Sequence, residues 1–182
     1  MRNTSPRTGV EPDRQGSLLE DAFARYQPEL LGTLYHLVGN AEDARDALQE
    51  TFLKCWRAGD EIKDVQNLKA WIFRVALNTG RDLRKTAWRR RRESLPNDDV
   101  MLTGPKEMMR PDEALDHDDR LDRVRRAVGQ LRPEEQEVFL LRQNGELTYD
   151  QIAAAVGAPC GTVKTRMRTA LAKLRAAVQD RA

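Results

Sequence analysis

The last third of the chain carries a run of helix signals that few folds can accommodate. Thr148-Tyr149-Asp150-Gln151 forms a capping box, because the threonine hydroxyl can accept a hydrogen bond from the amide of Gln151 while the glutamine side chain reaches back. This box opens a short helix. Gly157 supplies a turn, and Pro159 suits the first turn of a longer helix that continues through Arg175. A short helix, a tight turn and a long helix together predict a helix-turn-helix.

The longer of these two helices has two chemically different faces. Val163, Met167 and Leu174 recur at helical spacing and predict the buried face. The outer face carries only basic and hydroxyl side chains, namely Lys164, Thr165, Arg166, Arg168, Thr169 and Lys173. In a helix-turn-helix, the second helix enters the major groove of duplex DNA with its N-terminal half against the base edges. This outer face therefore predicts a site for duplex DNA.

Position along the helix separates two roles on this outer face. Phosphate contacts orient a protein on DNA, whereas contacts to base edges read the sequence. We expect the early residues to face bases and the others to bind phosphate: Lys164, Thr165, Arg166 and Thr169 for bases, Arg168 and Lys173 for phosphate. The alternative is a solvated basic face on an ordinary helical hairpin, since Lys and Arg are good helix formers. The coincidence of capping box, turn and basic helix favours DNA binding.

Helical spacing of apolar residues also runs through the first half of the chain. It predicts three long helices, over residues 18–38, 40–58 and 67–92. Asn40 and Asn67 are placed to cap the second and third. Pro28 is expected to kink or restart the first, because proline removes a backbone donor and clashes with the preceding turn. No stretch alternates polar and apolar residues over the length of a strand.

These signals predict an all-α fold of two small helical domains joined by a flexible linker, with the helix-turn-helix in the C-terminal domain. The 182 residues suffice for two such domains. Prolines and a glycine interrupt the periodicity between them, which indicates a linker. The expected divisions are a flexible leader over 1–16, a first domain over 17–92, an acidic linker over 93–116 and a second domain over 117–182.

The charges lie in blocks, although their formal sum is only +2. Residues 81–92 are strongly basic, residues 98–122 are dominated by Asp and Glu, and the charges of residues 164–175 are all basic. Two basic patches on either side of an acidic connector suit a protein that binds a polyanion twice.

Other features argue against catalysis, metal binding and membrane insertion. The only histidines are His36 and His117, and neither a nucleophile–base pairing nor a glycine-rich phosphate loop accompanies them. We therefore expect no catalytic residue, cofactor or small-molecule substrate. Cys55 and Cys160 lack metal-ligand spacing and are expected to be buried thiols, with a redox or metal role for Cys160 the minor alternative. Without an apolar run of about 20 residues or a signal segment, a cytoplasmic location is expected.

Several stretches resemble the extracytoplasmic-function (ECF) group of bacterial sigma factors, the promoter-recognition subunits of RNA polymerase. In the first half they are DARDALQETFL (43–53) and AWIFRVALNT (70–79). In the second half they are LRPE (131–134), VFLLR (138–142), LTY (147–149) and GTVKTR (161–166). With their helical context they cover most of residues 18–178. The order of the two halves around a linker strengthens the resemblance.

The resemblance implies roles for the first domain. Its second helix would bind core RNA polymerase through Asp46, Gln49, Glu50 and Leu53, although a solvated helix face would look the same. Its third helix would hold the melted downstream promoter element through Phe73, Arg74, Asn78, Arg81, Lys85 and Trp88. Basic, amide and aromatic groups of this kind suit single-stranded DNA. Arg89 to Arg92 would add phosphate affinity, and Trp56 and Trp71 are expected in the core.

The resemblance also implies partners and a mechanism. The second domain would read the upstream promoter element as duplex, the linker would follow the polymerase interior, and an anti-sigma factor would hold the protein inactive. The alternative is a helix-turn-helix repressor or activator acting without the polymerase core. That protein would need a dimerisation or effector-sensing domain, and the first half shows no alternation of strands and helices that would indicate one. A helical adaptor that binds only protein would leave the two basic patches unexplained.

Overall fold

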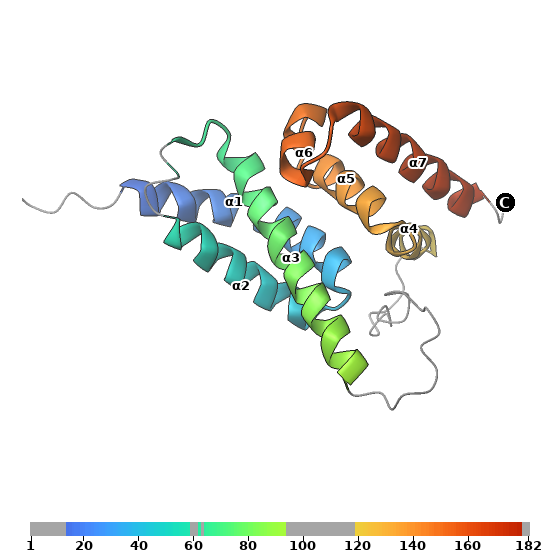
Figure 1. Cartoon of the computed structure of the whole chain (residues 1–182), viewed down its shortest axis with the longest axis horizontal. Coiled ribbons are helices and arrows are strands. Elements are labelled where there is room, and N and C mark those ends of the chain that lie inside the picture. Colours follow the sequence, from blue (N-terminus) through green and yellow to red (C-terminus); the bar gives the residue numbers. More distant parts are fainter. Residues whose placement is uncertain (1–13, 59–61, 63, 94–118, 180–182) are drawn as a thin grey trace, which may run out of the picture.

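The computed structural model describes residues 14–58, 62, 64–93 and 119–179. Within these ranges the chain forms seven helices and no strand, which confirms the predicted all-α fold. The helices fall into two groups that lie side by side (Figure 1). The segment predicted as an acidic linker, apart from Glu93 at the end of α3, and most of the predicted leader lie outside the described residues.

Three long helices make up the first group. They are α1 (Arg14–Val38), α2 (Ala41–Arg57) and α3 (Leu68–Glu93). The side chain of Asn40 accepts a hydrogen bond from the backbone N–H of Asp43 at 2.8 Å, and that of Asn67 accepts one from Ala70 at 2.9 Å. Both predicted caps are therefore confirmed. Each helix packs against the other two around a core that includes Leu30, Leu34, Ile72, Phe73 and Leu77.

The first helix begins earlier than predicted. It begins at Arg14, so the last residues of the predicted leader are helical. Of the two effects predicted for Pro28, a kink or a restart, the restart does not occur, because Pro28 lies inside α1 and does not end it. Proline leaves the carbonyl of Ala24 without its helical donor. Pro28 and Ala24 are both exposed, so water can satisfy that carbonyl while Leu30 and Leu34 continue the buried face.

Four helices make up the second group. They are α4 (Asp119–Gly129), α5 (Pro133–Gln143), α6 (Tyr149–Val156) and α7 (Cys160–Gln179). Thr148 Oγ1 accepts from the backbone N–H of Gln151 at 3.3 Å, and Gln151 Oε1 accepts from that of Thr148 at 2.8 Å. Gly157 then adopts the left-handed conformation (φ 67°) that ends α6. These contacts confirm the predicted capping box and helix-turn-helix.

One histidine lies close to the boundary between the two groups. His36 is near the end of α1, and its Nδ1 is buried without a hydrogen-bond partner. Burial, and secondly the positive charge of Arg125 on α4, lower the pKa of His36. The folded protein therefore disfavours the imidazolium form.

Acidification between about pH 6.5, the ordinary histidine pKa, and the lowered pKa of His36 is expected to destabilise the fold. In that window the unfolded chain binds a proton that the folded chain rejects, whereas above it both states are neutral at this side chain. Urea denaturation at several pH values, compared between the parent and His36→Gln, measures the effect. The variant should lose part of the pH dependence. If the free energy of unfolding changed equally with pH in the parent and the variant, His36 would not be the group responsible.

Candidate nucleic-acid interface

The polar face of α7 is open to solvent along its N-terminal half. Lys164, Thr165 and Arg168 are exposed, and Arg166 and Thr169 are partly exposed. The hydroxyl of Thr165 donates to the carbonyl of Gly161 at 3.0 Å, and that of Thr169 donates to the carbonyl of Thr165 at 3.1 Å. Each hydroxyl proton is thus used within the helix, and each oxygen retains a lone pair that can accept a hydrogen bond.

Lys173 differs from the other basic residues of this face because it is held by another helix. Its Nζ donates to Glu135 Oε2 on α5 at 2.6 Å, and the Glu135 side chain is only 8% exposed. Burial acts to raise the pKa of Glu135, but hydrogen bonds from Lys173 and the backbone of Arg132 hold it below its ordinary value. Lys173 therefore joins α7 to α5, which reduces its availability to DNA phosphate.

A tyrosine at the start of α6 brings two cations together. The Tyr149 ring lies 5.5 Å from the guanidinium carbon of Arg142 and 5.9 Å from Lys164 Nζ. Arg142 also donates from Nη1 to the carbonyl of Leu147 at 2.7 Å. Arg142 is therefore a further cation beside the polar face of α7, in addition to the predicted residues. Its basic side chain in the last turn before the helix-turn-helix is the only sequence signal for it, and its exposure is known from the structure.

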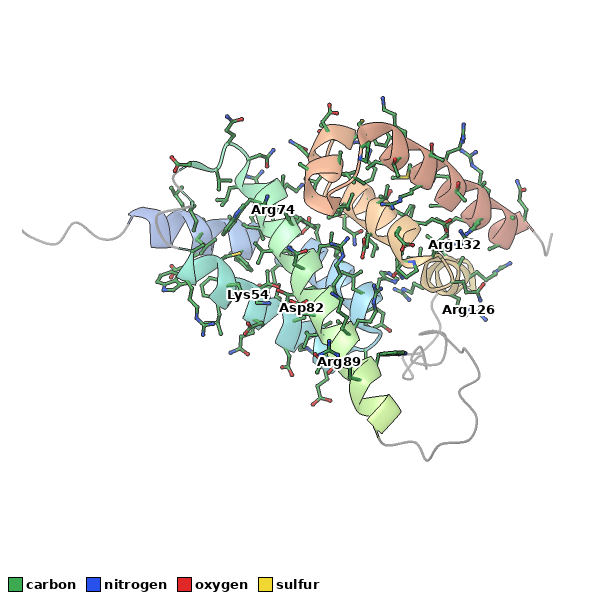
Figure 2. The ribbon with its side chains drawn as sticks, in the orientation of Figure 1. Lys54, Arg74, Asp82, Arg89, Arg126 and Arg132 are labelled. Atoms are coloured by element: carbon green, nitrogen blue, oxygen red, sulfur yellow. The ribbon has the colours of Figure 1, made fainter. Side chains whose placement is uncertain are left out.

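A second polar surface runs along α3. Arg74, Asn78, Arg81, Lys85 and Trp88 follow one another at spacings of three or four residues, so they share one face of the helix. Four of them are exposed, including Trp88 at 55%, whereas Arg81 is partly buried. Arg74 lies towards the N-terminal end of α3, and Arg89 extends the basic character towards the other end (Figure 2).

Phe73 does not belong to this surface, so its prediction as a DNA contact is wrong. Its side chain is fully buried with Ile72, Ala76 and Leu77. These four residues recur at helical spacing and face the core of the first group. Phe73 thus lies on the core side of α3, one position away from exposed Arg74.

The surface of α2 contains the residues predicted to bind polymerase. Asp46, Gln49 and Leu53 are exposed, and Glu50 is partly exposed. Trp56 follows one turn later and is 45% exposed, so its prediction as a core residue is wrong. It rests on Phe52, with ring centroids 5.8 Å apart, rather than inserting between helices. Leu53 and Trp56 thus add an exposed apolar end to the polar face of α2.

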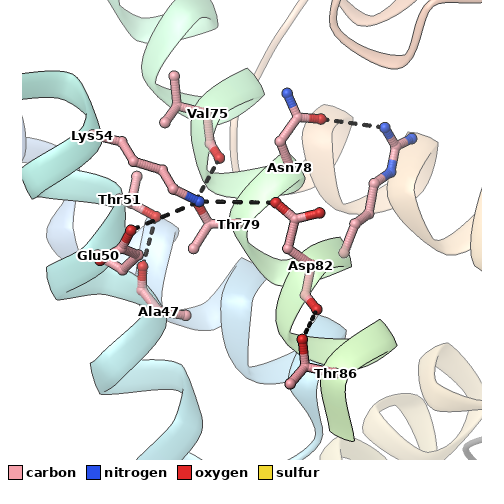
Figure 3. A network of polar contacts seen from close by, with 10 residues as sticks. Ala47, Glu50, Thr51, Lys54, Val75, Asn78, Thr79, Asp82 and Thr86 are labelled. Atoms are coloured by element: carbon pink, nitrogen blue, oxygen red, sulfur yellow. Dashed lines mark hydrogen bonds and ion pairs between the residues drawn. The ribbon is translucent and has the colours of Figure 1, made fainter. Parts of the chain in front are cut away.

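Lys54 connects α2 with α3 (Figure 3). Its Nζ donates to Thr79 Oγ1 at 3.2 Å and lies 3.9 Å from carboxylate oxygens of both Glu50 and Asp82. Thr79 is buried and donates to the carbonyl of Val75 at 3.0 Å. Lys54 therefore joins α2, which carries the acidic and apolar face, to α3, which carries the basic stripe.

Comparison with known proteins assigns both groups of helices. Residues 22–91 match sigma-70 region 2, and residues 121–174 match sigma-70 region 4. The RNA polymerase sigma-E factor of Streptomyces avermitilis is 31% identical over 176 residues, which cover 91% of this chain and 89% of that protein. The ECF sigma factor SigL of Mycobacterium tuberculosis is also 31% identical, over 167 residues covering 91% of this chain and 92% of SigL. The chain belongs to the ECF sigma factors.

The fold of this sigma factor agrees with that assignment. RpoE from Bartonella quintana, solved in complex with the anti-sigma factor NepR, has a TM-score of 0.72 and 22% identity, over 91% of this chain and 99% of that chain. The region 2 match contains the described face of α2 and the α3 stripe, and the region 4 match contains the α7 face. No described helix of the sigma factor is sufficiently long and apolar to cross a membrane.

The two cysteines of this sigma factor differ in environment. Cys55 is buried, which raises the pKa of its thiol to about 12. Cys160 is partly buried at the start of α7, where a hydrogen bond with Asp150 raises the pKa of its thiol. A raised pKa lowers the thiolate fraction and with it the reactivity. Among the described residues, no group of His, Cys, Asp and Glu side chains could hold a metal ion.

Proposed function

We propose that this sigma factor, acting in the cytoplasm without catalytic activity of its own, binds core RNA polymerase and directs it to promoters through two DNA-binding faces. The observation that carries the proposal is the presence, in one chain, of the exposed basic face on α7 and the separate basic stripe on α3. A duplex reader needs only the first of these. A protein that also holds a melted strand needs the second, with its aromatic and amide groups.

In this proposal α7 reads the upstream promoter element as duplex DNA. Lys164, Thr165, Arg166 and Thr169 lie in the half of the helix that meets base edges, and Arg168 contacts phosphate. The Tyr149 ring lies near both Lys164 and Arg142, so Arg142 of α5 adds a second cation beside this end of the α7 face. Lys173 contributes mainly through its ion pair with Glu135, and only secondarily through phosphate.

The stripe on α3 holds the melted downstream element. Arg74, Arg81 and Lys85 follow the phosphates, Asn78 contacts a base edge, and Trp88 provides a ring on which an unpaired base can stack. Phe73 has no part in this surface, since its side chain lies in the core.

The face of α2 binds core polymerase through Asp46, Gln49, Glu50, Leu53 and, in addition, Trp56. Exposed apolar and aromatic side chains surrounded by polar groups are typical of binding surfaces. An anti-sigma factor is a further proposed partner, because the Bartonella quintana sigma factor with this fold was solved bound to one.

Run-off transcription tests the proposal. Promoter fragments are transcribed by core polymerase alone and by core polymerase with this protein, and specific initiation should require the protein. Lys164→Ala with Arg166→Ala should reduce that initiation at least about 30-fold, since each specific base contact contributes about 1–3 kcal/mol. Arg175→Ala is the matched control, because Arg175 is an exposed cation near the far end of α7.

The opposite outcome would support a different function. If the protein bound duplex DNA but neither joined core polymerase nor started transcripts, it would act as a helix-turn-helix repressor or activator.

A further inference from the structure

Among the described residues, the polar contacts that join the two groups of helices include three between side chains far apart in the sequence. Each contact pairs a residue of α1 or α3 with a residue of α5 or of the turn after it. The pairs are Thr33–Asn144 (Oγ1 to Nδ2, 3.1 Å), Lys69–Glu146 (Nζ to Oε2, 3.1 Å) and Arg81–Glu137. Interfaces between domains that are held by polar contacts tend to open and close, in contrast to large apolar ones. We call the arrangement in which the two groups of helices are in contact the closed form. A few polar side chains can therefore control the stability of the closed form.

The Arg81–Glu137 pair has the best geometry of the three. Glu137 Oε1 accepts from Arg81 Nε at 2.8 Å, and Oε2 accepts from Nη2 at 2.5 Å. Arg84 Nη2 lies 4.0 Å from the same carboxylate. The Glu137 side chain is only 4% exposed. Such two-point pairing is the strongest form of ion pair, and a buried carboxylate requires it, because an unpaired buried charge is costly.

The pair occupies the middle of the α3 stripe. Arg81 lies between Asn78 and Lys85, and its Nη1 donates to Asn78 Oδ1 at 3.4 Å. The guanidinium group that would bind a phosphate of a melted strand is already bound to a carboxylate of α5. A carboxylate and a phosphate use the same planar set of donors on arginine, so only one of them can occupy it at a time.

We propose that Glu137 holds the free protein closed and thereby prevents single-stranded DNA from binding the α3 stripe. The inference rests on the function proposed above for α3. Separating the two groups of helices exposes Glu137 to water and releases Arg81 and Arg84 for a strand. In the free protein most molecules are closed, so the apparent affinity for a single strand is the affinity of the open form reduced by its small population.

The first measurement is the distance between the two groups of helices in the free, full-length protein. Nitroxide labels are attached at Arg45→Cys on α2 and Ala172→Cys on α7, both exposed positions, with Cys160 replaced by serine. Cys55 is buried and is expected to stay unlabelled. Double electron–electron resonance should give one narrow distribution for the parent. Glu137→Gln should lengthen and broaden it.

Two further variants make the distance measurement decisive. Glu20→Gln removes the same charge from an exposed position of α1 and should keep the parent distribution. Arg81→Met removes the other half of the pair and should open the protein as Glu137→Gln does, which also covers the case in which Glu137→Gln fails to fold. Circular dichroism verifies the helix content of each protein.

The second measurement is the binding of a fluorescein-labelled, mixed-sequence single-stranded oligonucleotide, followed by anisotropy. Glu137→Gln should bind it about tenfold more tightly than the parent, because the open population rises. Adding Lys85→Ala should remove most of this gain, which assigns the gain to α3. An unchanged distance, or an opened protein with no gain in strand binding, would overturn the inference.

Run-off transcription with the Glu137→Gln protein separates this inference from the proposed function. Polymerase and promoter DNA are both present in that assay, and Glu137 is no part of either DNA-binding face. Promoter-specific initiation together with an unchanged label distance would reject the role of Glu137 and leave the proposed function standing. If core polymerase together with the parent protein started no promoter-specific transcripts, the proposed function would be rejected, whatever the label distance.

Discussion

Replacing Phe73 with alanine is expected to lower the free energy of unfolding by about 3–5 kcal/mol. The side chain is fully buried among Ile72, Ala76 and Leu77, so its removal leaves a cavity in the core of the first group of helices. Urea denaturation followed by circular dichroism measures this difference.

The control for Phe73 is Lys85→Ala, an exposed change on the same helix. That variant should alter stability by less than about 0.5 kcal/mol. If instead Phe73→Ala kept the parent stability but lost affinity for single-stranded DNA, Phe73 would be a base contact and the packing described above would be wrong.

Replacing Trp56 with alanine is expected to weaken binding to core polymerase about 30-fold, which corresponds to about 2 kcal/mol. Trp56 is 45% exposed at the end of the α2 face, next to Leu53. Tryptophan is enriched among the few interface residues whose truncation costs this much. The dissociation constant is measured by biolayer interferometry with immobilised core polymerase.

Trp88→Ala is the matched control for Trp56→Ala. Trp88 is the same residue type with a similar exposed fraction, 55%, but it lies on the α3 stripe. Its replacement should change polymerase affinity by less than about twofold, within the range of residues outside hot spots, while weakening single-strand binding. Equal polymerase affinities for the parent and Trp56→Ala would remove Trp56 from the polymerase surface.

Local signals in the sequence located the helix boundaries well. Asn40, Asn67 and Thr148 were predicted as caps, and each side chain accepts the expected backbone hydrogen bond three residues later. Such a bond depends only on neighbouring residues, so no distant part of the chain can change the prediction. Pro28 does not restart α1, because the packing of the rest of the helix outweighs one missing hydrogen bond.

Exposure of the aromatic residues was predicted less well. Trp56 was expected in the core and is half exposed, whereas Phe73 was expected on the surface and is buried. Periodicity states which residues share a helix face, but the width of the buried stripe depends on how closely the neighbouring helices approach. Trp56 lies at the edge of such a stripe, where one aromatic neighbour, Phe52, supports it.

By itself, the sequence determined that this protein is all-α, where most of its helices begin and end, that its C-terminal part is a helix-turn-helix, and which residue stripes are basic. These properties follow from caps, turns and spacing within a few residues. Only the tertiary structure decided which basic side chains are available. Arg81 is held by Glu137, 56 residues away, and Lys173 by Glu135, 38 residues away. Such ion pairs form between helices brought together by packing, and no local pattern specifies them.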